Sequence, residues 1–450
     1  NVNLFAGQGA TIDANGVIDA SSASGLLSTG GNLAIGVFLD AATTATYIGV
    51  VGKLTGAEPL GIPDVTIGIA EFDVAFNVTD AAAAINADWS SLDNAASVAP
   101  TLAPLETATL LTISGTMYAG IADNLLVTGD FTLVTKVQDV DDGATSVENA
   151  LVVIFEMQNA AIYAGTGFSF IRADQASPIT GISTIGASGF EASDATLELI
   201  IVNDMTTGPP SNSWTAAYAA LGLATVHGLP SNLVFSLYDL SFGINNAAGD
   251  GSKLDWTSAV GTDASAGKIA ELPSGIATFD DEYVIAFGGT AHIEIDNSAI
   301  VVGTVDGKVI KDAALDDGAI QVTAADIIYF SVTGGHLFAG VGGSLTFNNA
   351  TDAVETDYTD ASGFSASGAN FEFVTVTGAV GAGLKTYAAL RASVAEVAVH
   401  GLDDQFTIKA YDLLIEVNDG ATDKLDWTAL GADIALALAD AANGIDAGVV

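Results

Sequence analysis

The chain has 450 residues, half of them apolar, and its 54 Asp and Glu against 11 Lys and Arg give a formal net charge of −43. That charge excludes nucleic-acid binding and attraction to anionic membranes, because both need clustered Lys and Arg. The absence of cysteine excludes a disulfide scaffold, a thiolate metal site and a Cys nucleophile. No apolar run of about 18 residues lacks a charge or a turn signal, so we expect no membrane insertion.

Two glycine landmarks recur along the chain in the same order. The first closes the segments Leu4–Gly7, Ile162–Gly165 and Leu337–Gly340, and the second is formed by Gly25-Leu26, Gly189-Phe190 and Gly363-Phe364. Val226-His227-Gly228-Leu229 returns as Val399-His400-Gly401-Leu402. Segments that return in one order indicate internal duplication, which is the sequence signature of repeat architectures.

A third landmark is an Asp-Trp pair followed by Ser or Thr. It occurs as Asp88-Trp89-Ser90, Asp255-Trp256-Thr257 and Asp426-Trp427-Thr428, with nearly equal spacing between successive tryptophans. We interpret each Trp as a plug that closes one end of a repeat, with Asp capping the turn that follows. The alternative is that the exposed aromatic faces stack on sugars.

The landmarks together predict a repeat with a period of about 170 residues. We assign residues 1–96 to a partial repeat, 97–263 and 264–434 to full repeats, and 435–450 to the start of a further repeat or a connecting segment. We therefore expect the sequence to open inside one repeat, as in a processed chain or a segment of a longer one.

The segments within a repeat are rich in branched and aromatic residues, which favour strands. In chain order they include Tyr283–Phe287, His292–Ile295 and Ile300–Val305, and the pairs that separate them resemble two-residue hairpin turns. Those pairs are Gly288-Gly289, Asp296-Asn297 and Asp306-Gly307, and Thr333-Gly334-Gly335 is interpreted in the same way. Helical periodicity is scarce: we expect helix in at most about a tenth of the residues, with the best candidate at Leu430–Ala442.

The predicted fold class is all-β, an elongated tandem-repeat array of strands of about 5–10 residues. Two architectures fit: stacked antiparallel hairpins that form a sandwich, or a β-solenoid whose coils share a core. Tight Asx-Gly turns favour hairpins, because parallel coils need longer connections.

The four histidines are the first residues to consider for catalysis. His227 and His400 occupy equivalent repeat positions, which favours a structural role, and His292 and His336 lie in no nucleophile motif. The 54 carboxylates offer no distinctive pair for glycoside hydrolysis. We therefore assign no catalytic residue and do not expect an enzyme.

Calcium is the one cofactor that the loops suggest, because they concentrate oxygen ligands. The candidate ligands are Asp250, Asp255, Asp419, Asp423 and Asp426. Neither an EF-hand nor the glycine-rich nonapeptide pattern is present, and the competing interpretation is that these residues form Asx turns that satisfy the backbone locally.

The repeated Lys253-Leu254-Asp255-Trp256 and Lys424-Leu425-Asp426-Trp427 segments, with acidic Ala-, Gly-, Val- and Thr-rich strands and no cysteine, resemble giant repetitive bacterial surface proteins of the hemagglutinin-like, adhesin type. The resemblance implies an extracellular or cell-surface location and a role in attachment or in a surface fibre.

We therefore expect a structural repeat protein that forms a filament or surface layer through end-to-end self-assembly. The alternatives are an adhesin stalk or carbohydrate-binding module that contacts surface polysaccharide, and a β-helical polysaccharide-degrading enzyme.

Overall fold

The computed structural model is dominated by strands. It describes the chain apart from residues 1–3, 9, 13–17, 20–23, 41–43, 61–64, 81–85, 90–101, 103–104, 122–124, 172–180, 206–211, 230–232, 262–266, 282, 296–298, 349–350, 352, 403–405, 421–422 and 431–450. Strands account for 75% of the structure and helix is almost absent, which confirms the predicted all-β class.

Sixteen strands follow one another in a sheet whose hydrogen-bonded order is the order of the chain. Residues 1–219 and 246–279 form one compact unit, and residues 220–245 and 280–450 form a second; we describe each by itself. The first unit holds β1 (Leu4–Gln8), β4 (Ser24–Leu39), β5 (Thr46–Leu60), β6 (Val65–Thr79), β7 (Thr109–Ile121), β8 (Leu125–Asp141), β9 (Ser146–Thr166), β12 (Ser188–Asn203) and the start of β13 (Ser213–His227). The second holds β14 (Leu233–Asn246), β15 (Tyr283–Ile295), β16 (Ala299–Asp316), β17 (Gln321–Val341), β20 (Ser362–Val380), β21 (Gly383–His400) and β22 (Ile408–Gly420).

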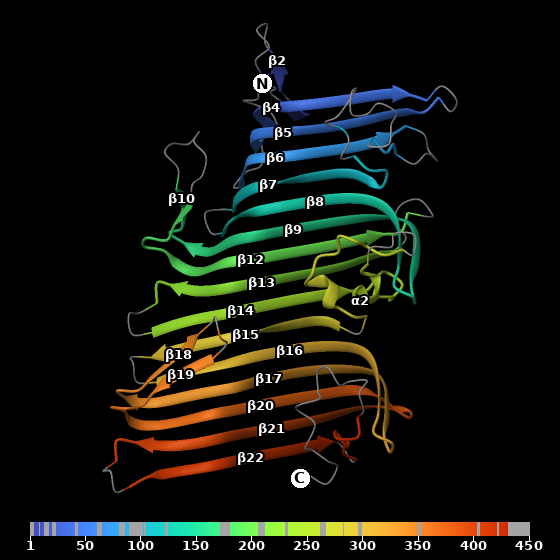
Figure 1. Cartoon of the computed structure of the whole chain (residues 1–450). Coiled ribbons are helices and arrows are strands. Elements are labelled where there is room, and N and C mark those ends of the chain that lie inside the picture. The colour runs from blue at the N-terminus through green and yellow to red at the C-terminus, as the bar shows by residue number, and fades with distance from the viewer. Residues whose placement is uncertain are drawn as a thin grey trace. The chain divides into compact units, whose positions relative to one another are not determined.

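Short hairpins and helical turns lie outside this order of strands (Figure 1). The hairpins pair β2 (Thr11–Ile12) with β3 (Ile18–Asp19), β10 (Ser169–Ile171) with β11 (Gly181–Ser183), and β18 (Ser344–Asn348) with β19 (Ala353–Asp357). The helical turns are α2 (Trp256–Ala259) and the 3-10 turn η3 (Ile276–Thr278).

The core of each unit forms on one face of its strands, because successive side chains of a strand point to opposite faces. In the first unit Val152 and Ile154 of β9 pack with Trp256, and in the second Ile327 of β17 packs with Trp427. We call the face that carries these tryptophans the front face and the opposite one the back face.

The two glycine landmarks found in the sequence are cross-strand partners. Gly7 pairs with Gly25, Gly165 with Gly189, and Gly340 with Gly363. A Cβ on Gly363 would lie 2.3 Å from the carbonyl oxygen of Ala339, and one on Gly165 would lie 2.2 Å from that of Ser188. At the Gly165–Gly189 and Gly340–Gly363 pairs the backbones approach too closely for any other residue, which explains why glycine returns there.

The predicted hairpin turns are wrong at three places. Gly288-Gly289 lies inside β15, Asp306-Gly307 inside β16 and Thr333-Gly334-Gly335 inside β17. Gly334 has φ +59° where the register between β17 and β20 shifts, so it forms a bulge rather than a chain reversal. Gly307 lies under the ring of Phe287 from the neighbouring strand, which leaves no room for a side chain.

The expectations of short strands and of a solenoid are corrected as well. The principal strands of the second unit run for 13 to 21 residues rather than 5–10, because the bulges let a strand continue past its glycines. The described strands form antiparallel sheets, and each strand of the large sheet lies beside the next one in its order, so the β-solenoid alternative is wrong. The sandwich form and the overall elongation stay predictions.

Some expectations fall outside the described residues. The repeat boundaries at 96/97, 263/264 and 434/435 do so, as does the Asp296-Asn297 turn, although Ile295 pairs with Ala299 on either side of it. The helix expected at Leu430–Ala442 also lies outside them, except for Leu430 itself.

Candidate functional site

The three landmark tryptophans are buried, with exposed fractions of 4% for Trp89, 0% for Trp256 and 1% for Trp427. The indole Nε1 of Trp89 donates to Oδ1 of Asn77 at 3.0 Å, and that of Trp427 donates to Oδ1 of Asn418 at 3.1 Å. The rings are therefore buried, as the plug interpretation requires, and their closing of a repeat stays a prediction. The sugar-stacking interpretation is wrong for these residues, because no ring face reaches the surface.

The aspartate before each of two tryptophans caps the turn that follows. Asp255 Oδ1 accepts from the N–H groups of Thr257 at 2.9 Å and Ser258 at 3.2 Å, at the start of α2. Asp426 Oδ1 accepts from the N–H of Thr428 at 3.0 Å. These short turns begin as the sequence predicts, with the carboxylate satisfying backbone donors that would otherwise be unpaired.

A second carboxylate, distant in sequence, fastens each capped turn to the sheet. Asp142 Oδ2 accepts from the backbone N–H of Asp255 at 2.9 Å, and Asp317 Oδ2 accepts from that of Asp426 at 2.9 Å. Burial raises the pKa of the Asp317 carboxyl, but hydrogen bonds from Asp426, Ile320 and Ala319 outweigh burial and leave the pKa below its ordinary value. Sequence reasoning missed these pairs, which are 113 and 109 residues apart.

Of the five calcium candidates, Asp250 and Asp255 lie in the first unit and Asp419, Asp423 and Asp426 lie in the second. Asp250 accepts from the N–H and hydroxyl of Ser252 and from Asn212, and these hydrogen bonds lower its pKa. Asp423 pairs with the ammonium of Lys385 at 3.0 Å, and Asp419 lies on β22 opposite Ala388.

Asp255 and Asp426 accept hydrogen bonds from the backbone N–H groups of the residues that follow them, which fits the interpretation of these loops as Asx turns. Within the part of the chain that the structure describes, no three Asp, Glu or His side chains are placed to hold a metal ion together.

The histidines separate into two kinds. His292 and His336 lie on either side of the buried Val302 in one cross-strand row, and burial lowers the pKa of both imidazoles. His400 ends β21, where its Nε2 lies 2.7 Å from Oγ of the buried Ser365 and its ring lies 4.5 Å from that of Tyr358. The Ser365–His400 pair is invisible to sequence motifs, because its members lie 35 residues apart on neighbouring strands.

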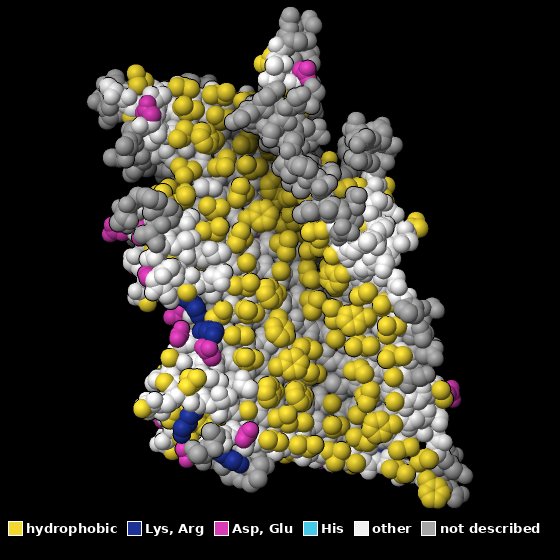
Figure 2. Space-filling view, turned by 180° about the vertical axis from the view of Figure 1, so that it is seen from behind, with side chains coloured by type: hydrophobic (Ala, Val, Ile, Leu, Met, Phe, Trp, Pro, Cys, Tyr) yellow, Lys and Arg dark blue, Asp and Glu magenta, His cyan; other side chains and the backbone are white. Residues whose placement is uncertain are grey.

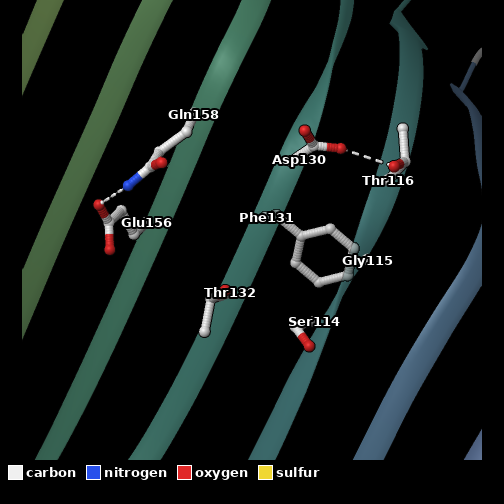
Figure 3. Close-up of a pocket in the computed structure, with 8 residues that line it drawn as sticks. All are labelled: Ser114, Gly115, Thr116, Asp130, Phe131, Thr132, Glu156 and Gln158. Carbon is white, nitrogen blue, oxygen red and sulfur yellow. Dashed lines mark hydrogen bonds between the residues drawn. The ribbon is translucent and has the colours of Figure 1, made fainter.

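A shallow hollow of about 310 Å³ opens over β7, β8 and β9 of the first unit (Figure 3). The hydroxyl of Thr116 donates to Asp130 at 2.6 Å, and the amide of Gln158 donates to Glu156. Hydroxyl, amide and carboxylate groups at this position suit a hydroxyl-bearing ligand. The ring of Phe131 is buried, however, and offers no stacking platform.

Glu156 is paired across the strands with Glu198, a buried carboxylate. Glu198 accepts from the N–H groups of Ile276 at 3.0 Å and Gly275 at 3.3 Å, at the start of η3. Burial raises the pKa of Glu198 above its ordinary value despite these hydrogen bonds, and the charge of Glu156 adds to the rise. The carboxylate therefore anchors η3 to the sheet.

The second unit carries a comparable hollow of about 280 Å³ lined by Thr333, Asn370, Glu372, Arg391 and Ser393. Arg391 pairs with Glu416 at 3.5 Å. Both hollows are open to solvent.

No protein-family model matches the chain, and neither the curated proteins nor the solved structures include a significant match to it. Within the described residues, no helix has the length and apolar character that crossing a membrane requires.

Proposed function

We propose that this chain is a structural repeat protein of the extracellular space or cell surface, which extends its sheet strand by strand into a filament or surface layer. The observation that carries the proposal is the recurrence of one register: Gly7–Gly25, Gly165–Gly189 and Gly340–Gly363 are cross-strand pairs. A backbone contact that returns with the sequence period is the signature of stacked repeat units.

Left-handed backbone positions support the same period. Asn159 on β9 and Gly334 on β17 both have positive φ and lie one period apart. Asp239 on β14 and Asp412 on β22 have φ +51° and +55° and are separated in the same way. Bulges shape the twist and bend of a strand, so their return supports repeated strands of the same form.

The order of the described strands is open at both ends, with β1 and β22 as its last members. β22 corresponds to β14 in the repeat, and β14 pairs along its length with β15, from Leu233–Ile295 to Ile244–Ile285. A strand like β15 is therefore the natural complement to the edge of β22. Among the described residues no strand pairs with the outer edge of β22, which is 13 residues long, and an open edge of this kind is a template for strand addition.

The test is negative-stain electron microscopy of the full chain, together with a synthetic peptide of residues 283–295. We expect fibres that lengthen with protein concentration, and we expect the peptide to shorten them by capping β22 while a scrambled peptide has no effect. Uniform single particles at every concentration, with no binding of the peptide, would contradict the proposal.

The second candidate is an adhesive, carbohydrate-binding surface module, favoured by the polar hollow of Figure 3. Its test is a glycan array probed with the parent chain and with Gln158→Ala. Binding that the substitution abolishes supports this candidate. The β-helical enzyme loses its premise, because the described strands form an antiparallel sheet rather than coils.

A further inference from the structure

The back face of the second unit is an apolar surface built from seven strands. On β17 the side chain of Ile327 packs into the core around Trp427, so its neighbour Ile328 points to the opposite face. Seen from behind, hydrophobic side chains cover much of the lower part of the molecule (Figure 2).

Two cross-strand rows form the centre of this face. Both follow from the pairing of β14, β15, β16, β17, β20, β21 and β22. The first is Phe242–Phe287–Gly307–Phe330–Phe373–Leu390–Val417, and the second is Ile244–Ile285–Val309–Ile328–Thr375–Ala388–Asp419. Twelve of these fourteen positions carry no polar side chain.

The rows lie open to solvent. The side chain of Ile328 is 52% exposed and that of Phe287 is 41% exposed, whereas Ile327 and Val376 on the front face are buried. An apolar patch of this size on a soluble protein marks an interaction surface.

The area is sufficient for a stable contact. Seven strands about 4.8 Å apart, with about 12 paired residues each, span roughly 30 Å by 40 Å, on the order of 1,000 Å². A standard protein interface buries about 800 Å² on each partner.

The charge distribution selects the occupant. Asp419 is the one charged residue in the two rows, and it lies on the last strand. The chain as a whole carries −43, which disfavours contact with an anionic membrane but leaves two nearly uncharged rows free to meet those of a second copy; Asp326, on the same face beside Ile328, is paired with Lys311. Two sheets of the same twist also pack well face to face, about 10 Å apart.

We propose that the back face of the second unit binds the back face of a second copy of this chain, forming a two-layered sheet with both front faces outward. The contact is isologous, so the same rows serve on both copies. It does not depend on the edge of β22 and therefore stands apart from the end-to-end contact proposed above.

The first unit repeats the pattern on its own back face. There the row is Ile35–Val50–Phe76–Leu111–Thr135–Val153–Ile201. Each unit therefore carries an apolar row on its own back face.

The experiment measures the mass of the full chain by light scattering with the 283–295 peptide present, so that growth at the edge is blocked. We expect a species of twice 45.2 kDa. Ile328→Asp should weaken dimerisation by at least about 100-fold, because it buries an unpaired charge in each copy. The matched control is Val234→Asp, because Val234 is 43% exposed but lies on the front face. It is the cross-strand partner of Glu294, which is in turn the partner of Ile300, a buried front-face residue. This control should still dimerise.

A second measurement avoids any loss of folding in the Asp variant. Because the chain has no cysteine, Ile328→Cys and Val234→Cys each introduce a single thiol. Modification by a charged maleimide should slow with rising protein concentration at position 328 and stay constant at position 234. A monomer at all concentrations, equal rates at both positions, or binding of the face to neutral phospholipid vesicles in place of a second copy would overturn the proposal. Dimers without fibres would instead overturn the end-to-end contact alone.

Discussion

Replacing Asn418 by Ala should lower the free energy of unfolding of the second unit by about 2–6 kcal/mol, because it leaves two buried polar groups without a hydrogen bond, at about 1–3 kcal/mol each. Asn418 is buried on β22, where its Nδ2 donates to the carbonyl oxygen of Leu425 at 2.9 Å and its Oδ1 accepts from Trp427 Nε1 at 3.1 Å. The alanine can replace neither hydrogen bond. Trp427 and Leu425 are themselves fully buried, so water has no easy access to the groups left behind.

The assay is urea unfolding of the full chain, followed by hydrogen exchange of β21 and β22 to assign the loss to this unit. A double-mutant cycle with Trp427→Phe isolates the Asn418–Trp427 bond, and we expect a coupling of about 1 kcal/mol. The matched control is Asn348→Ala, whose exposed amide donates to Glu355 and whose loss should change stability by less than about 0.5 kcal/mol. A change of that small size at Asn418, or strict additivity in the cycle, would refute the argument that Asn418 holds the plug.

Three further changes test the register, the carboxylate ties and the role of cations. Gly363→Ala should destabilise by about 1–3 kcal/mol, because its φ of +157° and the backbone of Ala339 both oppose a Cβ, whereas Gly383→Ala, with open space around it, should be neutral in urea unfolding. The pKa of Asp317 is lowered in the folded state, so its contribution to the free energy of unfolding is complete above the unfolded value near 4 and is lost as pH falls through the folded pKa. The Asp317→Asn variant should be less stable than the parent at pH 7 and should lose less stability on acidification, as measured by urea unfolding at pH 7 and at acid pH. Calcium at low salt should bundle the fibres, and chelation should disperse them, as measured by light scattering. Magnesium should act equally well, because the effect is screening of the −43 charge. An effect of calcium alone would instead favour ligation of calcium by the aspartates.

The sequence predicted the Asp-Trp plugs and the glycine landmarks because both depend on residues that no substitute replaces. A buried Trp needs a partner for its N–H, and the crossing of Gly340 and Gly363 leaves no space for a Cβ. The hairpin turns failed for the opposite reason. Glycine supplies positive φ and small size both in a turn and inside a strand. The local sequence at Gly288-Gly289 and Asp306-Gly307 therefore does not say whether the chain reverses direction there.

The candidate site illustrates a second limit. The capping role of Asp255 follows from the two residues after it, so local sequence suffices. The tie from Asp142 to Asp255 and the contact of Ser365 with His400 depend on the order of strands, which periodicity alone does not give. The calcium interpretation meets the same limit: an acidic loop does not say from its sequence whether its carboxylates hold a cation or, like Asp255 and Asp426, cap the backbone.

The composition of the chain is consistent with a sheet that needs a second layer. Half of the residues are apolar, yet the described plugs and side hairpins pack on the front face, and the rows through Ile328 and Phe287 stay uncovered. A sheet with one wet face should alternate between apolar and polar residues, as antiparallel sheets commonly do. Strand β17 instead carries Ile327, Ile328, Tyr329 and Phe330, apolar toward both faces, which is the pattern of a strand buried on both sides. The front face is already covered by the plugs and side hairpins, so the apolar back face is the surface on which a partner would bury exposed apolar side chains. A second copy supplies a partner face of the same length, the same twist and the same apolar rows.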